Sequence, residues 1–174
     1  EAAQGDLDPA FSRDGIVPVE DGSAFAVAAL PDGGTLVGIA HEAGNGNAKG
    51  YDALKLTSGG DVDTSYGSAG TADASSTGTA VAMVVGADGK TSFLEQTSFT
   101  NTSDQVRIVR LNADGSPDAG FGAGGIVELD LAGASDRAYD AALAPDGRLL
   151  VLANGPGDTD VVARDRGDGI RRWR

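Results

Sequence analysis

The sequence contains no cysteine, which excludes disulfide bonds, zinc–thiolate sites and thiol catalysis. Its single histidine, His41, has no serine in a Gly-x-Ser-x-Gly motif to act on, so nothing predicts a Ser-His-Asp hydrolase. Aromatic residues make up only 5% of the chain. No apolar run reaches the roughly 18 to 20 residues of a membrane-spanning helix, so we expect no membrane insertion.

Basic residues are also few. The chain has 13 Lys and Arg against 26 Asp and Glu, which gives a net charge of −13. Because a polyphosphate partner requires a basic surface, we expect no binding to nucleic acid. The chain begins Glu1-Ala2-Ala3-Gln4 without methionine, as a secreted protein does after its signal peptide is removed.

The sequence is rich in glycine, with 27 in 174 residues, and it repeats itself. Phe11, Tyr66 and Phe121 stand 55 residues apart, each at the end of a phrase in which Gly, Asp and the aromatic keep their places. The phrases are 5–11 (GDLDPAF), 60–66 (GDVDTSY) and 115–121 (GSPDAGF). A fixed period of this size indicates a repeat protein, in which each unit buries its apolar faces against its neighbours.

Each copy also carries an Asp-Gly turn between two apolar runs, at 31–33, 87–89 and 145–147. Such turns predict β-hairpins, with strands at 24–30 and 35–40, 79–85 and 91–95, and 137–144 and 148–153. A third strand is expected at 51–57, 106–111 and 160–164, and a fourth after each aromatic, as at 15–19 and 125–129. No helical period persists. The sequence therefore predicts an all-β, propeller-like protein with three four-stranded antiparallel blades.

These motifs resemble the delta-60 repeat of bacterial secreted and surface proteins, over residues 5 to about 169. The best copies are 112–122 and 144–151. The resemblance implies propeller-like blades and a secreted or cell-surface location in a bacterium, and it supplies no catalytic residues. The chain departs from the pattern at Ala87 in the second turn, at Tyr66, and at Asp165-Arg166, which weakens the expectation for the last strand of the third blade.

We take residues 1–174 as one repeat domain with units at about 5–59, 60–114 and 115–168 and a basic tail at 169–174. Closed propellers have four to eight blades, so three need a means of closure. A homodimer forming a six-bladed ring is the favoured solution. The alternatives are an open wedge capped by its own termini and a fragment of a longer array.

The candidate site residues fall into three groups. The loops Glu42 to Gly50 and Gln96 to Asp104 lie at corresponding places in successive blades, each just before the strand expected at 51–57 or 106–111, and we expect them to share one rim and bind a protein or glycan ligand. The tail could dock on another subunit through Arg and Trp, or it could be a frayed end; its residues are Arg171, Arg172, Trp173 and Arg174. The carboxylates that could ligate calcium are Asp6, Asp8, Asp61 and Asp63, although aspartates in turns more often bond their own backbone.

Apart from calcium, no cofactor is expected. The leading hypothesis for function is a secreted, non-catalytic binding or scaffold module that forms homo-oligomers. A carboxylate-based hydrolase or lyase acting on extracellular polysaccharide is the first alternative, and it would need two acids about 5 to 10 Å apart across a cleft. The second alternative is a structural subunit of a surface assembly or filament, because unclosed stacks can add end to end.

Overall fold

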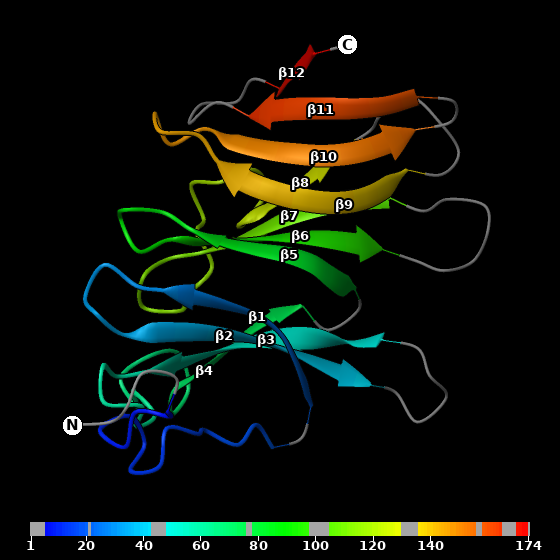
Figure 1. Cartoon of the computed structure of the whole chain (residues 1–174). Helices are drawn as coiled ribbons and strands as arrows, with labels where there is room; N and C mark the ends of the chain where they lie inside the picture. Colours follow the sequence, from blue (N-terminus) through cyan, green and yellow to red (C-terminus); the bar gives the residue numbers. More distant parts are fainter. Residues whose placement is uncertain are drawn as a thin grey trace.

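The computed structural model describes residues 6–20, 22–42, 48–75, 78–97, 105–129, 136–155, 158–164 and 170–173, and in these residues it is all-β (Figure 1). The first sheet contains β1 (Ser23–Ala29), β2 (Thr35–Glu42), β3 (Ala48–Leu56) and β4 (Thr71–Ser75). The second contains β5 (Thr79–Val85), β6 (Thr91–Thr97), β7 (Gln105–Leu111) and β8 (Ile126–Leu129). The third contains β9 (Arg137–Leu143), β10 (Leu149–Gly155), β11 (Asp158–Arg164) and β12 (Ile170–Trp173).

Each sheet is an antiparallel meander in which neighbouring strands follow one another in sequence. The three sheets stack face to face, and the first strand of the second sheet, β5, contacts both β1 and β9 (Figure 1). The Asp-Gly turns lie where the sequence predicts them, between the first and second strands. No described helix is long and apolar enough to cross a membrane.

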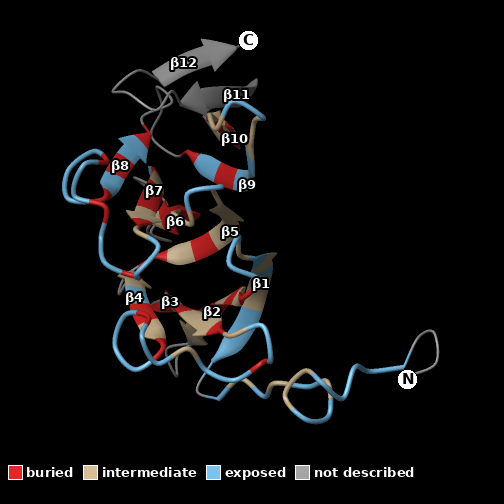
Figure 2. Cartoon of the chain, turned by 90° about the vertical axis from the view of Figure 1, so that its left-hand side faces the viewer, coloured by how far each residue is buried: buried red, intermediate tan, exposed pale blue. Residues whose placement is uncertain are grey.

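Buried residues gather between the sheets (Figure 2). One apolar cluster joins the first two sheets through residues such as Leu36, Tyr51, Phe93 and Leu111. A second joins the second and third sheets and includes Leu94, Ile108, Phe121 and Val151. Because the second sheet is covered on both faces, six consecutive residues of β6, Thr91 to Gln96, are all buried. Apolar burial between the sheets therefore holds the stack together.

Two expectations about strands need correction. Residues 16–19 form no strand, although 15–19 was predicted as one. The second correction concerns the sheet to which the strand after an aromatic belongs. The strand that follows the second aromatic phrase is β4, and it is the fourth strand of the first sheet. The second and third phrases thus lie in loops between a third and a fourth strand, and we call 57–70 and 112–125 the phrase loops. The sheets span residues 23–75, 79–129 and 137–173, so each crosses a boundary of the repeat units counted from the phrases.

Candidate binding groove on the turn rim

The Asp-Gly turns and the phrase loops lie at the same end of the sheets, which we call the turn rim (Figure 1). In each turn the aspartate accepts a hydrogen bond from the backbone N–H two residues later. The distances are 2.9 Å from Gly34 N to Asp32, 3.2 Å from Lys90 N to Asp88 and 3.1 Å from Arg148 N to Asp146. The glycine that follows each aspartate has a positive φ, between 76° and 85°. The turn sequence therefore fixes the backbone of this rim.

Basic side chains on the rim connect the sheets to the phrase loops. Lys55 on β3 donates to Asp32 at 2.8 Å and lies 3.2 Å from Asp63 in the first phrase loop. At the equivalent place in β7, 55 residues later, Arg110 pairs with Asp118 at 2.7 Å. The repeat thus reproduces the ion pair between the third strand and the phrase loop.

Asp118 also accepts a hydrogen bond from Lys90 at 2.9 Å, and its side chain is only 8% exposed. Burial by itself would raise the Asp118 pKa, but the hydrogen bonds from Lys90 and Arg110 outweigh it and hold the pKa below its usual value. The Arg110 guanidinium also lies over the Phe121 ring, 3.9 Å from its centroid. Asp118, Arg110 and Phe121 therefore form one packed unit.

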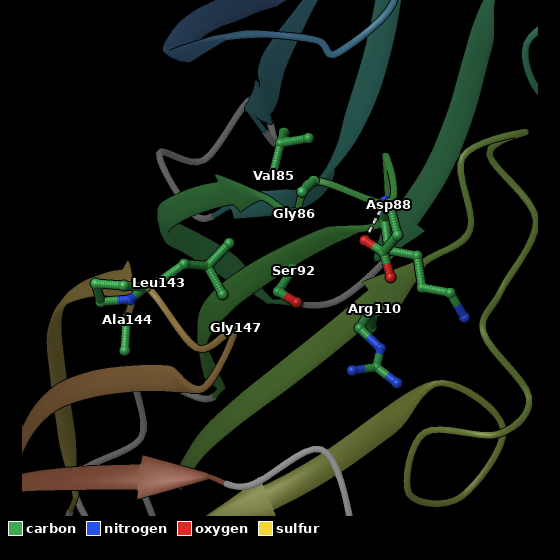
Figure 3. A pocket seen from close by; sticks show the side chains of 11 residues that line it. Val85, Gly86, Asp88, Ser92, Arg110, Leu143, Ala144 and Gly147 are labelled. Carbon is green, nitrogen blue, oxygen red and sulfur yellow. Dashed lines mark hydrogen bonds between the residues drawn. The ribbon is translucent and has the colours of Figure 1, made fainter.

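A groove of about 680 Å³ opens beside this unit, between the second and third sheets. Figure 3 places Leu143 and Ala144 of the third sheet on one side and Asp88 and Arg110 of the second on the other, with Ser92 between them. The groove combines an apolar wall with two cations. Its lining consists of Val85, Gly86, Ala87, Asp88, Lys90, Ser92, Arg110, Leu143, Ala144, Pro145 and Gly147.

A smaller hollow of about 240 Å³ occupies the corresponding position between the first and second sheets. It is lined in part by Leu30, Pro31, Asp32 and Lys55, with Asp88 and Ala113 of the second sheet opposite. Lys55 takes the place that Arg110 has in the larger groove. The stacking of repeats therefore produces a row of sites along the turn rim, of which the second is the larger.

Two of the four candidate calcium ligands accept hydrogen bonds from their own turns. Asp8 accepts the N–H of Ala10 at 2.9 Å, and Asp63 accepts the N–H of Ser65 at 3.1 Å, which is the turn role named as the alternative to calcium binding. Asp6 and Asp61 are exposed. Across the residues that the structure describes, no three acidic or histidine side chains gather in a way that could hold a metal ion.

The predicted ligand loops fall largely outside the described residues, which omit 43–47 and 98–104. At the edge of the second loop, Gln96 is buried and joins two sheets: it donates to Asp136 O at 2.8 Å and accepts the N–H of Ala138 at 2.9 Å. His41, at the end of β2, lies 2.8 Å from Asp52.

The basic tail is part of the third sheet. Residues 170–173 form β12, whose Arg171, Arg172 and Trp173 pair with Ala163, Val162 and Val161 of β11. Arg174 lies outside the described residues. The backbone of 170–173 is thus held in a sheet.

Sequence reasoning did not find the turn-rim groove or a buried polar network between the first two sheets. In that network the Tyr51 hydroxyl donates to Glu95 at 2.9 Å, and Arg107 forms an ion pair with the same carboxylate. Gly78 packs so closely against the Glu95 side chain that a Cβ there would overlap it. An acidic residue inside the apolar run of β6 is the sequence signal that could have indicated this polar network.

Residues 96–121 match a family model described as Domain of unknown function (DUF5122) beta-propeller. The matched stretch contains all of β7 and the second phrase loop as far as Phe121, so it includes Arg110 and Asp118. It supports assignment to a propeller-type repeat family, in agreement with the stacked antiparallel sheets. No curated protein matches the chain.

Proposed function

We propose that the chain is a non-catalytic binding module, and that the groove between its second and third sheets is the binding site. The observation that carries this proposal is the groove itself, in which Lys90 and Arg110 stand opposite the apolar residues Leu143 and Pro145. A concave, mostly apolar site with a few fixed polar groups is the usual form of a ligand site.

The chemistry of the lining favours an acidic peptide. Lys90 and Arg110 line the groove with one carboxylate, Asp88, and each has N–H groups beyond the one that bonds Asp118, which can donate to a ligand carboxylate. The apolar wall receives the neighbouring side chain. No aromatic residue lines the groove, so a sugar ring would have no exposed aromatic face to stack on. A protein ligand therefore fits better than a glycan.

A titration with three pools of short random peptides, one acidic, one neutral and one basic, tests the proposal. We expect the acidic pool to shift the backbone NMR signals of residues 85–92 and 143–147. Lys90→Ala should weaken this binding about fivefold to tenfold, because a charge-assisted hydrogen bond contributes on the order of 1 to 1.5 kcal/mol. Arg110 still pairs with Asp118 in this variant, so the site keeps its shape.

Arg148→Ala is the matched control, because Arg148 lies on the same rim, pairs with Asp146 and does not line the groove. It should leave binding unchanged. Equal binding of all three pools, or acidic binding that Lys90→Ala does not alter, would show that the groove is not the site.

The hydrolase alternative has less support in the described residues. Asp88 is the single acidic residue lining the larger groove, whereas a glycosidase needs two carboxyl groups about 5 to 10 Å apart. The secreted or cell-surface location in a bacterium stays a prediction from the sequence.

A further inference from the structure

Ser92 breaks the pattern of the repeat at one position in the turn-rim groove. It is the second residue of β6, directly after the Asp-Gly turn, and the second residues of β2 and β10 are Leu36 and Leu150. The first and third sheets thus have leucine at a place where the second sheet has a hydroxyl. Because the three sheets are built alike, this difference needs a physical account.

The leucine of the first sheet fills space that the serine leaves open. Leu36 is 1% exposed and packs in the apolar cluster between the first two sheets. It pairs with Lys55, which lines the smaller hollow of about 240 Å³. Ser92 instead lines the groove of about 680 Å³ between the second and third sheets. The shorter side chain therefore contributes to the larger volume of that groove.

The Ser92 hydroxyl stands in the groove without an internal partner. Ser92 is only 8% exposed, and no hydrogen bond among the described residues involves its side chain. Figure 3 shows it between Leu143 and Arg110. A nearly buried hydroxyl that bonds nothing destabilises the fold relative to an apolar group of the same size. The position therefore carries a donor that a ligand can satisfy.

Arg110 places further donors beside Ser92. The two residues pair directly across β6 and β7, so their Cβ atoms lie about 5 Å apart on one face of the sheet. The Arg110 Nε donates to Asp118 at 2.7 Å, and the guanidinium packs over the Phe121 ring. Its two terminal nitrogens bond no other described residue. Asp118 and Phe121 thus hold these free donors in place before a ligand binds.

A carboxylate is the ligand group that matches these donors. It is planar and accepts hydrogen bonds only, so it can take two parallel bonds from a guanidinium and a third from a hydroxyl. An amide has one acceptor oxygen, and its NH2 group would face donors. Asp88, the acidic residue of the lining, belongs to the turn and accepts the N–H of Lys90 at 3.2 Å.

We propose that Ser92 and the terminal nitrogens of Arg110 form a subsite that binds a side-chain carboxylate of the acidic peptide. This inference rests on the proposed function, because it names the part of the same groove that recognises the ligand. The smaller hollow has no such subsite: Leu36 replaces the hydroxyl, and Lys55 is already paired with two aspartates. One of the two hollows therefore binds the peptide.

An NMR titration compares the acidic peptide pool with the same pool in which every aspartate and glutamate is replaced by its amide. We expect the wild type to need at least tenfold more of the amide pool for half of the maximal shift. Ser92→Ala keeps the groove open and should weaken binding of the acidic pool about fivefold. Ser92→Leu copies the first sheet and should abolish binding. Ser58→Ala is the matched control, because Ser58 is an exposed serine of the first phrase loop that does not line the groove.

Ser92→Ala should also melt no lower than the wild type, since its hydroxyl bonds nothing inside the protein; a clear fall in Tm would overturn the proposal. So would an acidic pool that binds Ser92→Ala as tightly as the wild type. If Lys90→Ala still weakens binding in that case, the groove remains the binding site and only the subsite is wrong. Equal binding of the amide pool would exclude a carboxylate as the recognised group. An acidic pool that does not bind the wild type would overturn the proposed function and the subsite together.

Discussion

Glu95 shows how one residue can set the chemistry of an interface between sheets. It has 0% exposure in β6, at the position where the other two sheets have the apolar residues Ile39 and Ala153. A carboxylate without solvent needs partners that replace water, and Tyr51 and Arg107 fill that role. Burial and the neighbouring Glu95 charge raise the pKa of the Tyr51 hydroxyl well above its ordinary value, so it remains a donor.

Glu95→Gln should therefore lower the free energy of unfolding by about 3 kcal/mol, because it leaves the Arg107 charge without its buried counterion. Urea unfolding followed by circular dichroism measures the change. The control is Glu20→Gln, an exposed glutamate ahead of β1 for which we expect no loss. Equal stability of the two variants would mean that solvent reaches Arg107 and stabilises it without Glu95.

Tyr66 is buried, at 3% exposure, and its hydroxyl has no hydrogen-bond partner among the described residues. Burial, with a smaller contribution from Asp114, raises its pKa to about 12. The other two phrases have phenylalanine here. Tyr66→Phe should raise the free energy of unfolding by about 1 kcal/mol, since an unsatisfied buried polar group is removed. Tyr139→Phe, at a 45% exposed position, is the control, and a loss of stability in Tyr66→Phe would contradict this account.

At the scale of the element, the phrase loop depends on the carboxylate at its centre. Asp118 bonds Gly120 N, Lys90 and Arg110, and so joins the second phrase loop to β7 and to the Asp-Gly turn. Because its pKa in the folded state lies below the ordinary value of about 3.9, the ion pairs stabilise the fold at neutral pH. This contribution is lost as the pH falls through the folded-state pKa.

Asp118→Asn should therefore lose about 2 kcal/mol at pH 7, and the loss should shrink between pH 7 and pH 2 as the wild-type carboxyl takes up its proton. Unfolding free energies measured across this range should converge as the pH falls. Asp61→Asn is the control, because Asp61 is an exposed aspartate of the first phrase loop, and we expect no change at either pH. Curves that stay parallel down to pH 2 would assign the loss to something other than charge.

The strands and turns of the second sheet could be predicted from the sequence almost residue by residue, because alternation and Asp-Gly turns are local signals. The position of the repeated phrases relative to the sheets could not be predicted from the sequence. A period of 55 residues does not say whether a phrase opens a sheet or lies inside one, since strand pairing is decided by contacts distant in sequence. Residues 16–19 read as a strand for this reason, although no described strand pairs with them.

The candidate site was mostly missed for a related reason. Long polar loops attract attention in a sequence, whereas the turn-rim groove is lined by short turns and by strand residues such as Arg110 and Ser92. The recurrence of a cation at Lys55 and Arg110 was a usable signal. The calcium candidates could not be judged from sequence, because aspartates that ligate a metal and aspartates that bond their own turn have the same spacing.

At the scale of the whole molecule, stability is distributed along the stack. Repeat proteins behave as a series of units coupled to their nearest neighbours. The second sheet has two such neighbours and the others have one, so the first six residues of β6 are buried while β1 and β9 keep exposed positions. Local opening should then be easiest at the two ends.

Hydrogen exchange followed by mass spectrometry tests this order. At a concentration where the chain is monomeric, we expect the amides of β6 and β7 to exchange last, through global unfolding, and those of β1, β9 and β10 to exchange much earlier. Uniform exchange across the three sheets would mean that the stack unfolds as one cooperative unit, with no weakness at its ends.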